Sequence, residues 1–391
     1  MSRILLLLMI LVVSCGLPNG ARAAELVIGY LQLADDPRYE DKRALPQFLT
    51  AALGPSLPGA EVAVQESKFV LNSLNLELKL EPVEGSTADE LVKGIDELMQ
   101  KGAHFFLIDA PADVVAAVAA ATKGKELMLF NVSAPEDSLR QTQCQKHLLH
   151  VLPNQGMLMD ALVQYLVSRK WTKVLALEGP NPPDKLLSAA FERSAKRYGA
   201  KIVEKRPFVL SNDPRQRDQN NVALLTAGID YDVVFIADAS GEFARDTPYR
   251  TILPRPVVGS EGLAGAAWHW AWERQGAPQL SKRFEKEAKR AMRDPDWAAW
   301  MAVKIVIEAM ARTQSGDFKT VDAFIRGTQI VIDGFKGAPL SFRPWDNQLR
   351  QPIFLITHNW VIERAPVKGF LHQTNNLDTL GFDQPDSQCK F

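Results

Sequence analysis

The sequence lacks the short motifs that identify the commonest enzyme classes. It contains no Gly-x-Gly of a dinucleotide-binding loop, no Gly-x4-Gly-Lys phosphate loop, no Gly-x-Ser-x-Gly nucleophile elbow and no His-Glu-x-x-His zinc site. Because each of these chemistries needs its residues at that spacing, nucleotide, serine-hydrolase and metalloprotease functions are disfavoured. A general acid and base need no such motif, so other enzymes stay open at this point.

The sequence also lacks an excess of charge of either sign. The chain has 45 Lys and Arg against 46 Asp and Glu, a net charge of −1, and no long run of either sign. A nucleic-acid partner needs a clustered basic surface, so we expect none. With 46% hydrophobic and 23% charged residues the composition is globular. A length of 391 residues predicts two or three compact units.

Long apolar runs are confined to the N-terminus. Ile4–Val13 is apolar and follows a basic start, but a membrane span needs about 20 such residues. The run therefore predicts a signal peptide over residues 1–23, because Ala21-Arg22-Ala23 fits the cleavage pattern. The mature chain would be periplasmic. In the alternative, residues 12–15 act as a lipobox and Cys15 carries a lipid anchor.

Cysteine is scarce, and only Cys144 and Cys389 follow the signal peptide. Export permits a disulfide between them, and so long a loop would stabilise the fold by about 3 to 5 kcal/mol. Two free thiols are the equally weighted alternative. Cys144, His147 and His150 have metal-like spacing, but alternate side chains of an extended segment face opposite ways and no fourth ligand is evident. We expect no metal site.

Strand and helix patterns alternate along the first part of the chain. A helix begins at the capping box of Thr87 with Glu90 and ends at Gly102. Residues 43–60, which contain three prolines, are interpreted as a long loop. The other expected elements are strands at Leu26–Leu33, Leu76–Glu81, Phe105–Ile108 and Leu127–Val132 and a helix at Pro111–Ala121.

The same alternation restarts after Pro153. Helices are expected at Met157–Arg169, Pro183–Tyr198, Gln216–Thr226, Leu280–Met292, Trp297–Thr313 and Val321–Arg326, and strands at Lys173–Leu177, Lys201–Phe208, Val233–Ala237 and Pro352–Ile356. Such alternation forces parallel strands with crossover helices, so the fold class is α/β with two doubly wound parallel-sheet lobes. Two lobes facing each other form a cleft at their strand ends, which favours a binding protein over an enzyme.

Several segments carry a resemblance through their order and spacing. They are Leu129–Pro135 followed by Arg140 and Cys144, Leu148–Pro153, Tyr165-Leu166, Trp171–Val174, Asp232–Phe235, Val258–Gly262 and Trp300–Ala302. Together they resemble the type I periplasmic solute-binding proteins of ABC transporters, in the leucine/isoleucine/valine-binding group. The resemblance implies a small-molecule ligand, a permease partner in the inner membrane, a hinge motion, a monomer and no required cofactor.

The resemblance also implies how the chain is divided. Three crossovers near residues 150, 262 and 347 would join the lobes. Lobe I would take residues 24–150 and 263–347, and lobe II would take residues 151–262. Residues 348–391 would complete lobe II and form the C-terminal tail.

Within that group the chain looks most like a subfamily associated with pyrroloquinoline quinone (PQQ)-dependent alcohol oxidation. The features are Tyr30-Leu31 with Asp36–Tyr39, Gln65–Phe69, Ala237–Phe243, Ala267–His269 and Gly381–Cys389. The resemblance suggests PQQ or a related aromatic carboxylate as the transported ligand. The alternatives are a branched-chain or other amino acid, and a ligand sensor that transports nothing.

Two sequence differences from the amino-acid binders argue against an amino acid as the ligand. Their aromatic residue after the first strand of lobe II is replaced by Glu178–Pro183. Their carboxylate-binding turn survives only as Ser133-Ala134-Pro135, and Pro135 has no N–H to donate.

The candidate ligand residues follow from the chemistry of a flat carboxylate. Arg38 follows the first strand and is the preferred cation, with Arg140 and Lys68 as weaker candidates. Trp268 and Trp297 are candidates for stacking, although any single tryptophan is more often core.

Acidic and turn residues complete the candidates. Glu261 matches the residue that holds the ammonium group in amino-acid binders, and in the cleft it would repel a carboxylate. Asp109 and Asp238 end strands and are expected to accept hydrogen bonds, and Ser133 and Ala134 form the remaining turn.

Overall fold

The computed structural model describes residues 24–39, 54–211 and 213–391. The expected signal peptide, Cys15 and most of the loop expected at 43–60 lie outside these residues. Across the described residues, no helix combines the length and apolar character that a membrane crossing requires.

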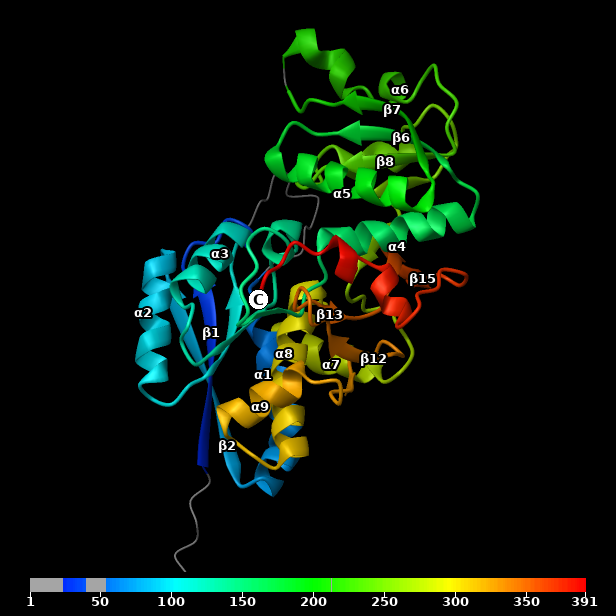
Figure 1. Ribbon diagram of the computed structural model, residues 1–391. Coiled ribbons are helices and arrows are strands. Elements are labelled where there is room, and N and C mark those ends of the chain that lie inside the picture. Colours follow the sequence, from blue (N-terminus) through cyan, green and yellow to red (C-terminus); the bar gives the residue numbers. More distant parts are fainter. Residues whose placement is uncertain (1–23, 40–53, 212) are drawn as a thin grey trace, which may run out of the picture.

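Lobe I is built on a parallel five-stranded sheet of order β2-β1-β3-β4-β5. Its strands are β1 (Ala24–Leu33), β2 (Leu76–Gly85), β3 (Phe105–Asp109), β4 (Met128–Asn131) and β5 (Leu148–His150). Helices α1 (Leu57–Ser73) and α8 (Asp294–Thr313) cover one face, and α2 (Ala88–Met99) and α3 (Ala112–Ala121) cover the other (Figure 1). Side chains along β1 alternate accordingly, because Ile28 and Tyr30 join the α1/α8 core and Leu31 joins the α2/α3 core.

Lobe II repeats this design with a parallel four-stranded sheet of order β7-β6-β8-β9. Its strands are β6 (Lys173–Glu178), β7 (Lys201–Pro207), β8 (Val233–Ala237) and β9 (Val257–Gly259). Helices α4 (Gln155–Ser168) and α5 (Pro182–Tyr198) pack on one face, and the other is covered by α6 (Val222–Leu225) and by loops that bury Phe208, Tyr231 and Phe243. The predicted fold class, two doubly wound α/β lobes, is confirmed.

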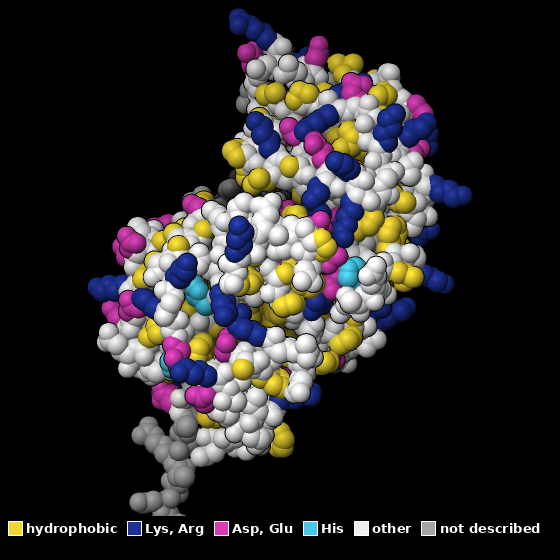
Figure 2. Space-filling view, in the orientation of Figure 1, with side chains coloured by type: hydrophobic (Ala, Val, Ile, Leu, Met, Phe, Trp, Pro, Cys, Tyr) yellow, Lys and Arg dark blue, Asp and Glu magenta, His cyan; other side chains and the backbone are white. Residues whose placement is uncertain are grey.

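The chain passes from one lobe core to the other at three places. These lie between Leu152 and Met157, between Leu263 and Ala267, and between Leu349 and Ile353. Near the last crossing, β14 (Ile353–Thr357) serves both cores, because Phe354 packs in lobe I while Leu355 packs in lobe II. Figure 2 shows the molecule narrowing between the two lobes, with charged side chains of both signs intermingled over this face.

The C-terminal strands form sheets of their own. Strand β14 pairs antiparallel with β10 (Ala264–Ala266) and β15 (Trp360–Ala365), and a second small antiparallel sheet contains β11 (Ile332–Asp333), β12 (Pro339–Phe342) and β13 (Leu349–Arg350). Helices α7 (Ala277–Ala288) and α9 (Phe318–Arg326) complete the described helices of lobe I.

Two expected elements differ in the structure. The expected loop at 43–60 ends early, because α1 begins at Leu57, and Pro58 is tolerated in its first turn, where a missing N–H costs nothing. The expected helix Gln216–Thr226 is wrong. The structure has a 3-10 segment, Pro214–Asn220, and then the one-turn helix α6, whose start at Asn221 is capped by that side chain.

A disulfide bond joins Cys144 to Cys389 across 245 positions. It ties the C-terminal tail to the segment between β4 and β5, and in Figure 1 the tail runs back from α4 to the lower lobe. Because its sulfur is bonded to Cys389, Cys144 does not act as a metal ligand.

Candidate functional site

The carboxyl ends of β1, β3 and β4 bring five polar side chains together in lobe I. Asp36, Arg38 and Tyr39 follow β1, Asp109 ends β3, and Ser133 follows β4. Neighbouring parallel strands end at the same edge of a sheet, which is where ligands bind in this class of fold. These five residues are called the Arg38 cluster below.

Asp109 is the centre of the Arg38 cluster and is fully buried. Its Oδ2 accepts hydrogen bonds from the hydroxyl of Tyr30 (2.7 Å) and from the backbone N–H (2.9 Å) and hydroxyl (2.7 Å) of Ser56. Its Oδ1 accepts from the Tyr39 hydroxyl (2.5 Å) and from Arg38 Nη2 (3.1 Å). Burial alone would raise the pKa of Asp109, but the Arg38 charge and these hydrogen bonds outweigh it and lower the pKa.

Most of the hydrogen-bonding capacity of Arg38 is used within the cluster. Its Nε lies 3.0 Å from both carboxylate oxygens of Asp36, Nη2 also donates to Asp36 at 2.6 Å, and Nη1 donates to Ser133 Oγ at 3.0 Å. A guanidinium has five N–H groups. One N–H of Nη1 therefore remains for a ligand, and the side chain is 29% exposed.

The charges of the Arg38 cluster do not favour a polyanion. One guanidinium is set between the two carboxylates of Asp36 and Asp109, so the five residues carry a net charge of −1, and Arg293, the cation that interacts with Asp109 from outside the cluster, is itself paired with Asp296. A ligand that brings one carboxylate to the free N–H meets a modest repulsion, and each additional carboxylate adds to it.

The turn at Ser133 and Ala134 does not offer its backbone to a ligand. Both N–H groups donate to Asn131 Oδ1, at 3.3 and 2.9 Å, and Asn131 Nδ2 donates to the Ala134 carbonyl at 2.8 Å. The Ser133 hydroxyl remains at the site as the partner of Arg38.

The candidates at the strand ends of lobe II have different surroundings. Asp238 caps its own loop, accepting from the Ser240 hydroxyl (2.7 Å) and from the N–H groups of Phe243 (2.8 Å) and Ala244 (2.9 Å). Glu261 is half-buried and uses Oε1 to accept the N–H of Gly262 at 3.0 Å. Its second oxygen has no hydrogen-bond partner among the described residues, so it is available to a donor.

The two candidate tryptophans are buried in the core of lobe I. Trp268 and Trp297 stack on each other with ring centroids 6.4 Å apart. The indole N–H of Trp297 donates to the Gly334 carbonyl at 3.0 Å, and Lys336 Nζ lies 4.2 Å from the centre of its ring. The structure therefore does not bring them to the Arg38 cluster.

The weaker cationic candidates also lie away from the cluster. Arg140 is fully buried, and it donates to Gln348 Oε1 (2.9 Å) and to the carbonyl of Leu152 (2.9 Å), so it supports the crossing segments. Lys68 is exposed on α1.

Two members of the Arg38 cluster and one residue that contacts its Asp109 were missed as site residues in the sequence. Asp36 and Tyr39 are next to Arg38 after β1, so the argument that selected Arg38 could also have identified them as site residues. Ser56 lay in a segment interpreted as loop, and nothing in the sequence indicated that it would contact Asp109.

The comparisons with known proteins agree with this architecture. Residues 77–245 match the profile of a family described as periplasmic binding protein. No curated protein sequence matches the chain. This match covers less than half of the chain, and the likeness of the whole chain to solved structures is one of fold.

Three solved structures illustrate the shared fold. A periplasmic binding protein from Burkholderia mallei has a TM-score of 0.66 at 14% identity, over 94% of this chain and 99% of that one. A branched chain amino acid ABC transporter periplasmic ligand-binding protein from Burkholderia xenovorans has 0.66 at 15%, over 85% and 90%. A solute binding protein of an R. palustris ABC transporter, in complex with benzoate, has 0.62 at 12%, over 94% and 100%.

Proposed function

We propose that this chain is the periplasmic substrate-binding component of an ABC importer, which captures a small solute between its lobes and passes it to a permease in the inner membrane. The fold and the family match over residues 77–245 support this proposal. The observation that carries it is the Arg38 cluster, where a partly exposed guanidinium at the strand ends keeps one N–H free.

Within this function, the ligand that we propose is a small aromatic carboxylate. A neighbour with the same fold is in complex with benzoate, and Arg38 offers a charged donor of the kind that carboxylates prefer. PQQ belongs to this chemical class and is the ligand suggested by the resemblance. It carries three carboxylates, however, and Asp36 and Asp109 disfavour the second and third. We therefore expect a monocarboxylate to bind more tightly than PQQ.

The test is a calorimetric titration of the purified mature protein with benzoate, PQQ and leucine in parallel, followed by thermal unfolding. A ligand at 100 times its Kd should stabilise the fold by about 2.7 kcal/mol. We expect benzoate or PQQ to bind, and R38Q to weaken that binding while R215Q, on an exposed segment of lobe II, leaves it unchanged. Saturable binding of leucine alone would reject the aromatic ligand.

A second candidate, an amino acid, is favoured by one observation. The free carboxylate oxygen of Glu261 is a suitable acceptor for an ammonium group, and Arg38 would take the α-carboxylate. In that case E261Q should abolish leucine binding and leave benzoate binding unchanged.

A strain that lacks the gene distinguishes a role in transport from a role in sensing. If the chain serves an importer, loss of its gene should slow uptake of the bound solute. Normal uptake with an altered transcriptional response would instead support the sensor.

A further inference from the structure

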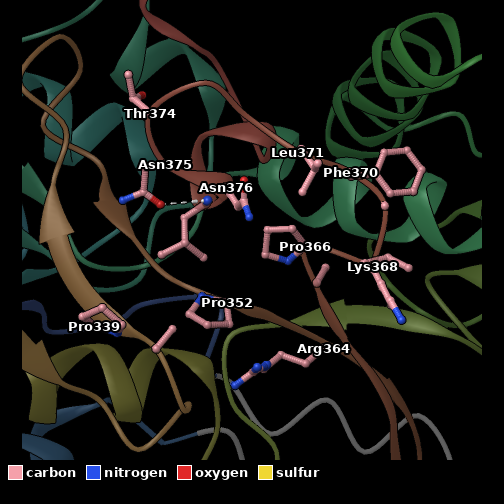
Figure 3. A pocket seen from close by; sticks show the side chains of 15 residues that line it. Pro339, Pro352, Arg364, Pro366, Lys368, Phe370, Leu371, Thr374, Asn375 and Asn376 are labelled. Atoms are coloured by element: carbon pink, nitrogen blue, oxygen red, sulfur yellow. Dashed lines mark hydrogen bonds between the residues drawn. The ribbon is translucent and has the colours of Figure 1, made fainter.

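A hollow of about 610 Å³ lies on the surface beside the third crossing, away from the Arg38 cluster. Its walls come from the start of β12, from Pro352, and from the end of β15 with the segment that follows it. Figure 3 shows Pro352 and Pro366 at its centre, Leu371 and Asn376 above them and Arg364 below. Its volume lies within the range of sites for small molecules, about 300 to 1,000 Å³.

The hollow has apolar side chains on its floor and a rim where Leu371 stands beside the polar Thr374, Asn375 and Asn376. Pro352, Ala365, Val367 and Leu377 are buried, whereas Leu371 on the rim is 79% exposed. Large aliphatic side chains on a protein surface are usually at least partly covered, and a ligand with an apolar body would remove Leu371 from water.

The charges that line the hollow are all positive. Arg364 and Lys368 are its two ionised residues, and its lining contains no Asp or Glu. Arg364 Nη1 donates to the carbonyls of Lys336 (2.8 Å) and Gly337 (2.9 Å), which leaves Nε and Nη2 without a hydrogen-bond partner among the described residues. Lys368 is exposed and its side chain has no ion pair or hydrogen bond within the described chain.

The acidic groups near the hollow lie outside its lining. Glu363 Oε1 accepts the backbone N–H of Arg364 at 2.9 Å, and Glu363 and Glu273 line an adjacent hollow that Arg364 also borders. Asp378 is buried and pairs with Arg343 and Arg350, each at 2.8 Å.

We propose that this hollow, the Lys368 pocket, is a second binding site that takes a small amphiphilic anion, with its apolar part against Pro366 and Leu371 and its anionic group at Lys368, while Arg364 adds positive charge at the opposite side of the hollow. Apolar walls with two unpaired cations and no acid are complementary to such a ligand and oppose a cation. The proposal does not depend on the ligand of the cleft.

The walls of the Lys368 pocket belong to both lobes. Leu340, next to Pro339, packs in the lobe I core, whereas Val367 packs in the lobe II core. A ligand here touches segments on either side of the third crossing.

The test uses the full mature protein and the fluorescent anion 8-anilinonaphthalene-1-sulfonate. The variant K368E reverses an exposed charge that has no partner, so it should fold normally, and K101E makes the same change on an exposed lysine of lobe I. We expect K368E to weaken probe binding about tenfold, because it removes a charge-assisted contact, and K101E to leave it unchanged. Octanoate should displace the probe and octylammonium should not.

Three results would overturn the proposal. They are equal probe affinity in K368E and the parent, equal displacement by octanoate and octylammonium, and loss of probe binding in R38Q but not in K368E. The last would assign the probe to the cleft. Circular dichroism and the Tm of each variant show that its fold is intact.

Discussion

At the scale of single residues, Asp109 holds together side chains from distant parts of the chain. Its two oxygens bind Tyr30 from β1, Arg38 and Tyr39 from the following loop and Ser56 before α1. A buried carboxylate with this many donors is stabilised in its ionised form, so its pKa is lowered from an ordinary value near 3.8.

This lowered pKa predicts an acid-dependent loss of stability. Because the folded pKa lies below the unfolded one, the contribution of Asp109 is fully present above the unfolded pKa and is lost as the pH falls through the folded pKa. We expect D109N to lower the free energy of unfolding by about 2 kcal/mol at neutral pH and to flatten its decline in acid. Urea unfolding between pH 2 and pH 7 measures both.

The matched control is D113N, on the exposed side of α3, where the carboxylate has no hydrogen-bond partner among the described residues. Because Asp113 lies in the first turn of α3, D113N should lower the free energy of unfolding by no more than about 0.3 to 1 kcal/mol, well below the loss in D109N. An acid dependence in D109N equal to that of the parent would contradict the role assigned to Asp109.

We predict that Asp36 lowers the affinity of the site for ligands with more than one carboxylate. It shares the Arg38 guanidinium at distances of 2.6 to 3.0 Å. In D36N the cluster becomes neutral while the amide keeps most of the shape, so affinity for a tricarboxylate such as PQQ should rise about tenfold. Benzoate should gain less. Parallel titrations of both ligands measure the ratio, and an unchanged ratio would reject this role.

Residue types alone predicted part of the site. Arg38 and Asp109 were selected because they follow or end strands and Ser133 because of the family resemblance, and the structure brings the three into one cluster. Trp268 and Trp297 were selected for their chemistry. Whether an indole packs in a core or faces a cleft is decided by tertiary contacts that the sequence pattern does not record.

At the scale of elements, the first turn of α8 connects the helix to the second crossing. Asp294 is half-buried and accepts the N–H groups of Ala267 and Trp268, both at 2.8 Å. Lys336 is buried, interacts electrostatically with Asp294 and donates to Gln351 Oε1 at 2.7 Å, and Gln351 Nε2 donates to the Val151 carbonyl at 2.7 Å. This polar network therefore reaches the second crossing at Ala267 and the third at Gln351, and it borders the first at Val151.

We expect D294A to be strongly destabilising. It leaves the buried N–H groups of Ala267 and Trp268 without their acceptor and removes a carboxylate that interacts electrostatically with the buried Lys336, which predicts a loss of about 3 to 5 kcal/mol in the free energy of unfolding. D317A removes the exposed cap of α9 and should cost only about 1 kcal/mol. Chemical denaturation of both variants measures the difference, and equal losses would contradict the network.

Elements with strong periodicity were predicted well. The helix α2 follows its Thr87 cap as expected, and the buried strands β3 and β8 begin at the predicted residues. The failures at α1 and at Gln216–Thr226 have opposite causes. At α1 the prolines led to the prediction of a loop, although a helix tolerates proline in its first turn. At Gln216–Thr226 a long helix was predicted from polar residues without an apolar stripe, and the local hydrogen bonds of Asn and Asp side chains, which favour turns, were overlooked.

At the scale of the whole molecule, repeated alternation of strands and helices was enough to predict two doubly wound lobes. The small antiparallel sheets were not predicted, because β10 and β14 are separated by 87 positions in the chain, from 266 to 353, and neither segment alone indicates its partner. The sequence likewise left the pairing of Cys144 and Cys389 open.

The disulfide is predicted to contribute to stability throughout the molecule. Replacing both cysteines, as C144S/C389S, removes a constraint on the unfolded chain and should lower the free energy of unfolding by about 3 to 5 kcal/mol. Chemical denaturation of this variant measures the loss, and reduction of the parent protein should reproduce it. Unchanged stability would mean that the tail is held by its noncovalent contacts.

The same bond changes how the lobes are linked. Val367 and Leu380 pack in lobe II, whereas Cys144 lies between Leu139 and Leu148 of the lobe I core. The backbone and the disulfide thus form a covalent loop that passes through both lobes, and the segment from Leu380 to Cys389 links lobe II to lobe I. If the lobes move apart when a ligand leaves, this segment would limit their separation, and reduction of the bond would remove that limit.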